Sequence, residues 1–238
     1  MGNGNVFERL WKLETQVKKL VLEGKRDPEK VANILQAILE GSVEATFSKA
    51  SKTEPAVTFD WLAVYDKLGL ATEYAEFVKT NPDNSTPGLW SVPVIKGATP
   101  NKVVAALRKL GVAVYLYTND LDTNVTKNHR DPANGSYSVS FKANIEADPE
   151  LANKSADTLK AENVNGITLI ERLLLEVAYF MATGKHLDEK NVTLCSGSRS
   201  SDGGVPGVDW NSGNREVYVG WYFSDYSDSN LRARAVVS

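Results

Sequence analysis

The strongest hydrophobic pattern in the chain lies between Gly166 and Gly184. Apolar residues at helical spacing there cover more than half of a helix circumference, which is wider than the stripe of a surface helix. Thr168 and Glu171 have the spacing of a capping box, and Gly184 suits the left-handed residue that ends a helix. The pattern predicts a central helix over about 166–184 that other elements cover on several sides.

A second helical pattern lies near the N-terminus. Residues 5–23 carry apolar side chains at alternating spacings of four and three, which is the seam of a helix that pairs with another helix. Asp27 and Pro28 are typical of the N-cap and the first position of a following helix. The sequence therefore predicts a helical hairpin over residues 1–41.

The hairpin has two alternative roles. It either binds a protein partner or a second copy through residues 5–40, or it packs on the core of its own chain. Residues 42–57 lose the helical periodicity and are predicted to be a linker. Residues 58–238 are then expected to form an α+β domain, in which a mixed sheet packs around the central helix.

Strand patterns recur after residue 88. Apolar runs over 89–95 and 112–118 flank a helical pattern over 99–110, which is the order of a βαβ unit. These two strands either pair in one sheet or are separated by another strand, as in an α+β sheet. Residues 196–207 are rich in glycine and serine and are predicted to form a loop. Alternation of polar and apolar positions predicts two further strands, over 137–143 and 216–223.

Aromatic residues gather toward the C-terminus. Alternation within the predicted strand puts Tyr218 and Tyr222 on one face and Trp221 and Phe223 on the other. One face is expected in the core, and the other is expected to be exposed, where it lines a ligand groove or a partner surface. The cluster consists of Trp210, Tyr218, Trp221, Tyr222, Phe223 and Tyr226.

Composition narrows the function classes. A net charge of -3 and a pI of about 5.6 give no overall attraction to nucleic acids or anionic membranes, so neither partner is expected. No apolar run reaches the roughly 18 residues of a membrane-spanning helix. The single cysteine, Cys195, excludes an intrachain disulfide and favours a reducing compartment. A cytoplasmic location is therefore predicted.

One candidate metal site follows the strand over 112–118. Asp120, Asp122 and Asp131 place carboxylates at and beyond the end of that strand, where α/β sheets bind ligands. Carboxylate oxygens are suited to a hard divalent cation. The spacing departs from a calcium-binding EF-hand, because Val125 stands where the turn needs glycine. The alternative is that these residues cap backbone groups in turns.

A candidate anion site lies in the glycine- and serine-rich loop. Ser198, Arg199 and Gly203 offer a hydroxyl, a guanidinium and a backbone donor to a phosphate or another anion. The loop lacks the lysine and following hydroxyl of a P-loop, so the nucleotide-binding motif is absent. Combined with the acidic residues, this loop would give a metal- or phosphate-dependent enzyme.

Three segments also carry a resemblance to other proteins. They are Lys25–Ala32, Gly166–Leu175 and Gly184–Asp188. Together they resemble a group of uncharacterised proteins from bacteria of the Parcubacteria-type candidate phyla. The resemblance implies a bacterial, cytoplasmic protein and transfers no catalytic residue, substrate or cofactor. The sequence contains no convincing catalytic constellation, so it favours a non-catalytic binding or interaction protein. The alternative is the metal- or phosphate-dependent enzyme.

Overall fold

The chain divides into two units, Met1–Glu54 and Pro55–Ser238, which are described here separately. The structure is a computed structural model, and its α+β class agrees with the sequence prediction. The residues that it describes are 14–24, 27–29, 31–32, 36, 57–82 and 86–237.

The first unit is described only in part. Residues 14–22 are helical, and Gly24 has a left-handed φ of 68°, which ends the helix where the sequence predicts. Asp27 accepts the backbone N–H of Glu29 through its side chain, as the predicted N-cap requires. Residues 28–29, 31–32 and 36 are helical, and the rest of the predicted hairpin, with residues 42–56 of the predicted linker, lies outside the described residues.

The second unit holds the following elements. The helices are α3 (Trp61–Leu68), α4 (Ala71–Thr80), α5 (Pro100–Lys109), α6 (Leu121–Asn124), α7 (Ala156–Ala161) and α8 (Leu169–Thr183), with 3-10 turns η1 (Pro132–Asn134) and η2 (Pro149–Leu151). The strands are β1 (Leu89–Val94), β2 (Ala113–Leu116), β3 (Val125–Asn128), β4 (Tyr137–Lys142), β5 (Val192–Leu194), β6 (Ser198–Ser200), β7 (Val205–Asn211), β8 (Glu216–Tyr222) and β9 (Leu231–Arg232).

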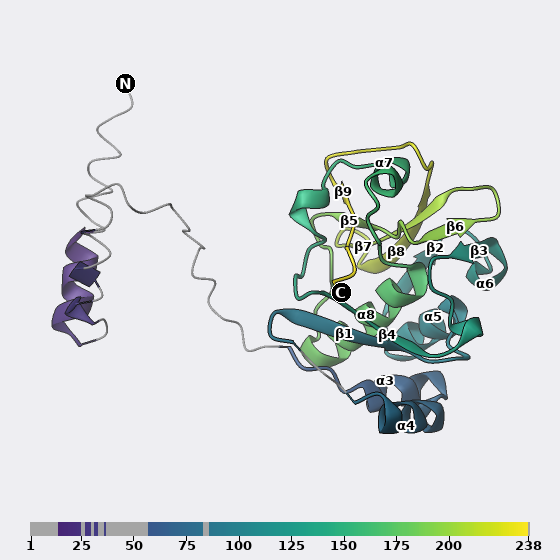
Figure 1. Cartoon of the computed structure of the whole chain (residues 1–238), viewed down its shortest axis with the longest axis horizontal. Coiled ribbons are helices and arrows are strands. Elements are labelled where there is room, and N and C mark those ends of the chain that lie inside the picture. Colours follow the sequence, from purple (N-terminus) through teal and green to yellow (C-terminus); the bar gives the residue numbers. More distant parts are fainter. Residues whose placement is uncertain are drawn as a thin grey trace. The chain divides into compact units, whose positions relative to one another are not determined.

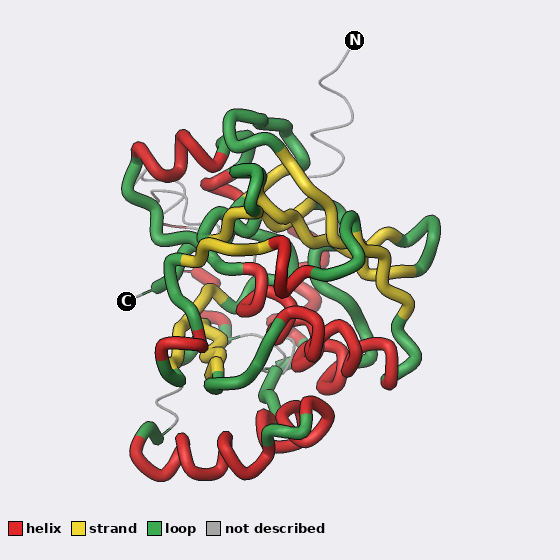
Figure 2. The backbone as a smooth tube through the Cα atoms, turned by 90° about the vertical axis from the view of Figure 1, so that its right-hand side faces the viewer, coloured by secondary structure: helices red, strands yellow, loops and turns green. Residues whose placement is uncertain are grey.

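These elements form layers (Figure 1). A five-stranded sheet has the order β2-β8-β7-β5-β9, and β1 pairs with β4 in a separate two-stranded sheet. Helix α8 lies between the two sheets beside α5, and α3 and α4 lie beyond the β1–β4 pair. Figure 2 shows the same order from the side, with α3 and α4 at the bottom.

Helix α8 is the central helix that the sequence predicts. Its capping box forms between Thr168 and Glu171, and Gly184 ends the helix with a left-handed φ of 68°. Every residue from Leu169 to Tyr179 is buried, so no face of that segment is exposed to solvent. A helix that is buried all round must be covered on all sides, and the layers on either side of α8 provide that cover.

The predicted βαβ unit does not form. Strand β1 pairs antiparallel with β4, whereas β2 pairs in parallel with β8, so the two strands that flank α5 belong to different sheets. The partner of β2 comes about a hundred residues later in the chain. Local periodicity finds strands but contains no information on such distant pairing, which is why the order of elements was a poor guide to the topology.

Half of the predicted loop over 196–207 is strand. It contains β6 and the first residues of β7, and a β-carbon added to Gly204 would lie 1.9 Å from Nε1 of Trp221. Gly204 is therefore present because an aromatic ring lies against it, whereas the neighbouring Gly203 has a φ of 90° and is present because the backbone turns. Composition alone does not distinguish these two uses of glycine.

Candidate binding site

The two faces of the five-stranded sheet differ in what covers them. In the β7–β8 pairing, Val208 lies opposite Val219, and both are fully buried in the main core with α8. The alternate positions point to the other, outer face, where Asp209 lies opposite Tyr218 and Gly207 lies opposite Gly220. The outer face of this pair therefore carries polar, aromatic and glycine residues.

Four tyrosines form a strip along this outer face. The rings of Tyr115 and Tyr218 are stacked with centroids 4.7 Å apart and planes at 1°. The rings of Tyr222 and Tyr226 are stacked at 5.9 Å and 20°. We call Tyr115, Tyr218, Tyr222 and Tyr226 the tyrosine strip. No hydrogen bond to any of their hydroxyl groups occurs within the described part of the chain, which leaves four donors for a ligand.

Two glycines bring the two stacked pairs together. A β-carbon on Gly220 would lie 2.8 Å from Cε1 of Tyr218 and 3.7 Å from Cε2 of Tyr222. A β-carbon on Gly207 would lie 2.4 Å from the same atom of Tyr222. Both rings therefore lie over the glycine pair, and the four tyrosines make one continuous surface instead of two separate pairs.

Only part of the outer face is covered. Helix α7, η2 and the C-terminal segment bury Leu194, Val205 and Leu231 in a second, smaller hydrophobic cluster, and Tyr222 packs against its edge. The β2 edge of the face lies outside that cluster, and 45% of Tyr115 is exposed there. The exposed part of the face therefore begins where α7 stops covering it.

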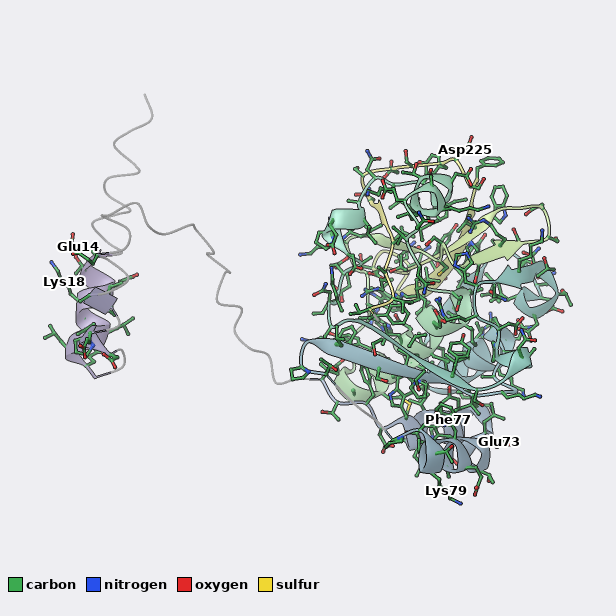
Figure 3. The ribbon with its side chains drawn as sticks, viewed as in Figure 1. Glu14, Lys18, Glu73, Phe77, Lys79 and Asp225 are labelled. Carbon is green, nitrogen blue, oxygen red and sulfur yellow. The ribbon has the colours of Figure 1, made fainter. Side chains whose placement is uncertain are left out.

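A shallow pocket adjoins the tyrosine strip. The turn after β8 joins the two, because its Tyr226 stacks on Tyr222 while its Phe223 lines the pocket beside Trp221. Phe223 and Trp221 meet edge to face at 4.6 Å, and 66% of Phe223 is exposed. Asp225 of the same turn lies at the opposite end of this unit from Phe77 of α4 (Figure 3). The pocket has a volume of about 390 Å³, and its lining is Asp157, Asp202, Gly203, Gly204, Trp221, Phe223, Ser224 and Asp225.

Asp209 is the ionisable group nearest the centre of the strip. Burial raises its pKa from 3.8 to about 6, and the carboxylates of Asp188 and Glu176 add to the rise, while Arg172 opposes it. Burial also raises the pKa of Tyr222 to about 12, and the charge of Asp209 contributes. The phenol therefore stays protonated at neutral pH, next to a carboxylate that is held in a poorly solvated position.

This position predicts a pH-dependent effect of Asp209→Asn on stability. Between pH 3.8 and about 6 the folded protein holds the Asp209 proton more tightly than the unfolded chain, so this contribution to stability is present at low pH and is lost as pH rises through 6. A shift of one pKa unit corresponds to about 1.4 kcal/mol. Because the Asp209 side chain is partly exposed, we discount the full shift and expect the substitution to stabilise the protein by about 1 kcal/mol at pH 7. At pH 4 it should change little. Thermal unfolding across this pH range measures the effect, and exposed Asp66→Asn is the matched control. An equal effect at both pH values would contradict the burial of an ionised Asp209.

The sheet that carries the strip is anchored by buried ion pairs. Asp188 accepts hydrogen bonds from Arg172 at 2.9 Å, from Arg234 at 2.8 Å and from the Thr193 hydroxyl at 2.5 Å. The other end of Arg172 donates to Glu176 at 2.8 Å. All five residues are at most 1% exposed, so the network lies in the interior between α8 and the sheet.

His186 extends this network to the sheet. Its Nδ1 lies 2.8 Å from Glu176 Oε1, and its ring stacks on Trp210 of β7 with centroids 3.5 Å apart. The backbone N–H of Trp210 donates to the carbonyl of Asp188 at 3.1 Å. Strand β7 is therefore held to α8 immediately beside Asp209.

The predicted metal residues serve as caps. Asp120 accepts two backbone N–H groups of α6 and the side-chain amide of Asn101 at 2.6 Å. Asp122 accepts the backbone N–H of Asn101, and Asp131 caps η1. Among the described residues no group of three or more histidine, cysteine, aspartate or glutamate side chains could hold a metal ion. A divalent cation at these residues stays a prediction.

The loop that contains the predicted anion residues meets the loop that contains the predicted metal residues. Strands β3 and β6 pair, so the two loops that contain the candidate groups do meet. Arg199 donates to the carbonyls of Ser196 and Ser198, and the buried Ser198 hydroxyl donates to Asn128. Gly203 lies in the turn before β7 and lines the pocket. Anion binding at these three residues is untested.

Sequence reasoning missed Asp209 and the buried network. The signal was the presence of Arg172 and Glu176 inside an otherwise apolar helix, since charges that are buried all round need partners. Arg130 was missed in the same way: it binds the carboxylate of Glu171 at 2.7 and 2.9 Å and thereby fixes the loop before β4 to α8.

A second pocket, of about 590 Å³, lies between α4 and the β1–β4 pair. Its lining contains no charged residue, and residues 83–85, which follow its lining residue Pro82 in the sequence, lie outside the described part of the chain. The tyrosine strip is therefore the better-defined candidate. No helix among the described residues has the length and apolar character to cross a membrane. Comparisons of the chain with protein-family models, with curated proteins and with solved structures found no match.

Proposed function

We propose that this chain is a non-catalytic binding protein whose second unit recognises a partner protein through the tyrosine strip. One observation carries the proposal: within the described residues, the exposed aromatic side chains are Tyr115 and Tyr226, which belong to the strip, and Phe223, which lines the pocket beside it. Tyrosine is enriched at protein interfaces because its rigid ring buries a large area while its hydroxyl forms hydrogen bonds.

The surrounding fold supports a recognition role. The ion pairs of Asp188 and the packing of α8 hold the strands in place, so Tyr115, Tyr218 and Tyr222 of the strip are carried on rigid elements. A preorganised surface loses little conformational entropy when it binds. The proposal needs no bound cofactor and no catalytic group.

The test is a selection of random displayed peptides on the full chain. Peptides that use the strip should bind about tenfold more weakly to Tyr115→Ala or Tyr226→Ala, because a few aromatic anchors contribute most of the affinity of an interface. Leu62→Ala is the matched control, since Leu62 is an apolar residue of α3 that is 51% exposed. Peptides whose affinity is the same for all three variants and the unaltered chain would count against the proposal.

The predicted self-association through residues 5–40 is a separate matter. Of the apolar seam, only Val17 and Leu20 fall within the described residues, and Val17 is 36% exposed. The role of the hairpin remains a prediction.

A further inference from the structure

We propose that the partner of the tyrosine strip is a basic protein segment, which presents lysine or arginine side chains to the tyrosine rings and to the adjoining pocket. This inference rests on the proposed function and adds the chemistry of the partner. Its basis is the charge that surrounds the exposed aromatic residues.

The charged groups that act on the strip are acidic. Tyr218 feels the charges of Asp209 and Glu216, and Tyr222 feels those of Asp209 and Asp228, in each case in the direction that raises the pKa of the phenol. No lysine or arginine is among the groups that shift either phenol. An incoming cation would therefore meet negative charge along the strip.

The adjoining pocket repeats this arrangement. Its lining includes Asp157, Asp202 and Asp225 and no basic residue. Asp202 accepts hydrogen bonds from the Ser200 hydroxyl and the Trp221 indole, which lower its pKa and keep it ionised at neutral pH. The carboxylates thus lie around the exposed Phe223 ring, and the pocket has both the charge and the aromatic faces that an ammonium or guanidinium group prefers.

Two arginines near this surface donate their hydrogen bonds to backbone carbonyls. Arg108 donates to the carbonyl of Val114, on the edge strand β2. Arg199 interacts with Asp157, but its guanidinium donates to the carbonyls of Ser196 and Ser198. Two of the three pocket carboxylates are therefore not opposed by this arginine.

Binding of a basic segment should depend on pH through Asp209. The groups that face this carboxyl are Arg172 and Glu176 from α8, Asp188 from the segment before β5, and Tyr218 and Tyr222 from β8. With a pKa of about 6 in the free protein, Asp209 is ionised at pH 7.5 and largely protonated at pH 5. Affinity for a cation should therefore fall as pH drops through 6.

The experiment uses the peptides selected on the full chain at pH 7.5. Peptides that weaken on Tyr115→Ala should be enriched in lysine and arginine by about twofold over the input library, as expected for charge-complementary surfaces. Their affinity should fall by about fivefold on Asp209→Asn, in the range of a partly exposed ion pair, and should be unchanged on Asp66→Asn. The affinity of the unaltered protein should fall by a similar factor between pH 7.5 and pH 5, and that of Asp209→Asn should fall less.

The outcomes separate this inference from the proposed function. Strip-dependent peptides without lysine or arginine enrichment, or with acidic enrichment, would overturn the basic partner and leave the binding function standing. The absence of any strip-dependent peptide would overturn both. If light scattering shows a dimer of the full chain that Tyr115→Ala dissociates, the strip binds a second copy, and the basic partner is wrong.

Discussion

Asp188→Asn should destabilise the second unit by about 3–5 kcal/mol, because it leaves two buried guanidinium groups without a full counter-charge. Asp188 is fully buried and binds both Arg172 and Arg234. Its backbone has a left-handed φ of 57°, which asparagine tolerates as well as aspartate does. The substitution therefore tests the charge and not the backbone. Denaturant unfolding at pH 7 measures the loss.

Two further variants identify the cause of this loss. Asp66→Asn makes the same chemical change on the exposed side of α3 and should stay within about 0.5 kcal/mol of the unaltered chain. Asp188→Asn combined with Arg172→Met should lose less than the sum of the two single changes, because the second removes one stranded charge. Strict additivity would mean that the ion pair does not exist as described.

Leu174→Ala should cost about 2–5 kcal/mol, the range for removing a large apolar side chain from a closed core. Leu174 is fully buried in the middle of α8, between the layers that cover that helix. The control is Leu62→Ala, where the same change is made at a half-exposed position of α3 and should cost under about 0.5 kcal/mol. Equal losses at both positions would show that α8 is not central.

Much of the local structure could be predicted from the sequence. The capping box at Thr168, the N-cap Thr99 before Pro100 and the stop at Gly69 all occur where the residues indicate. These features depend on neighbours within four residues, so the sequence contains all the information they need. The broad apolar surface of α8 predicted its burial for the same reason.

The pairing of strands could not be predicted in the same way. Strand β8 pairs with β2 on one side and β7 on the other, and nothing in the local pattern of Ala113–Leu116 specifies a partner at Glu216. Gly207 belongs to β7 although its composition predicts a loop, because the ring that covers it comes from another strand. Long-range contacts decided both outcomes.

The candidate site was likewise predictable only where it depends on residues that are close in the sequence. Alternation in β8 correctly separated Tyr218 and Tyr222 from Val217 and Val219, so the exposed aromatic face was expected. The contribution of Tyr115 and Asp209 was not expected, because each residue reaches the strip from a different strand. A binding surface assembled across three strands becomes visible only when their order is known.

The buried network and the tyrosine strip have opposite energetic roles. The ion pairs of Asp188 hold the frame, whereas the ionised Asp209 opposes folding at neutral pH. The Asp209 carboxylate lowers the stability of the fold, and it lies at an exposed aromatic surface. Binding sites often contain such destabilising residues because the residues contribute to function. This contrast is why Asp209→Asn is expected to raise stability and to lower affinity in one substitution.

Hydrogen exchange of the full chain, with and without a selected lysine- or arginine-bearing peptide, tests the central claim most directly. Backbone exchange should slow in β2, in β8 and in the turn through Tyr226, and it should stay unchanged in α3 and α4. Slowing confined to α4 and the β1–β4 pair, around the other pocket, would place the binding surface at the wrong end of the unit and contradict the account.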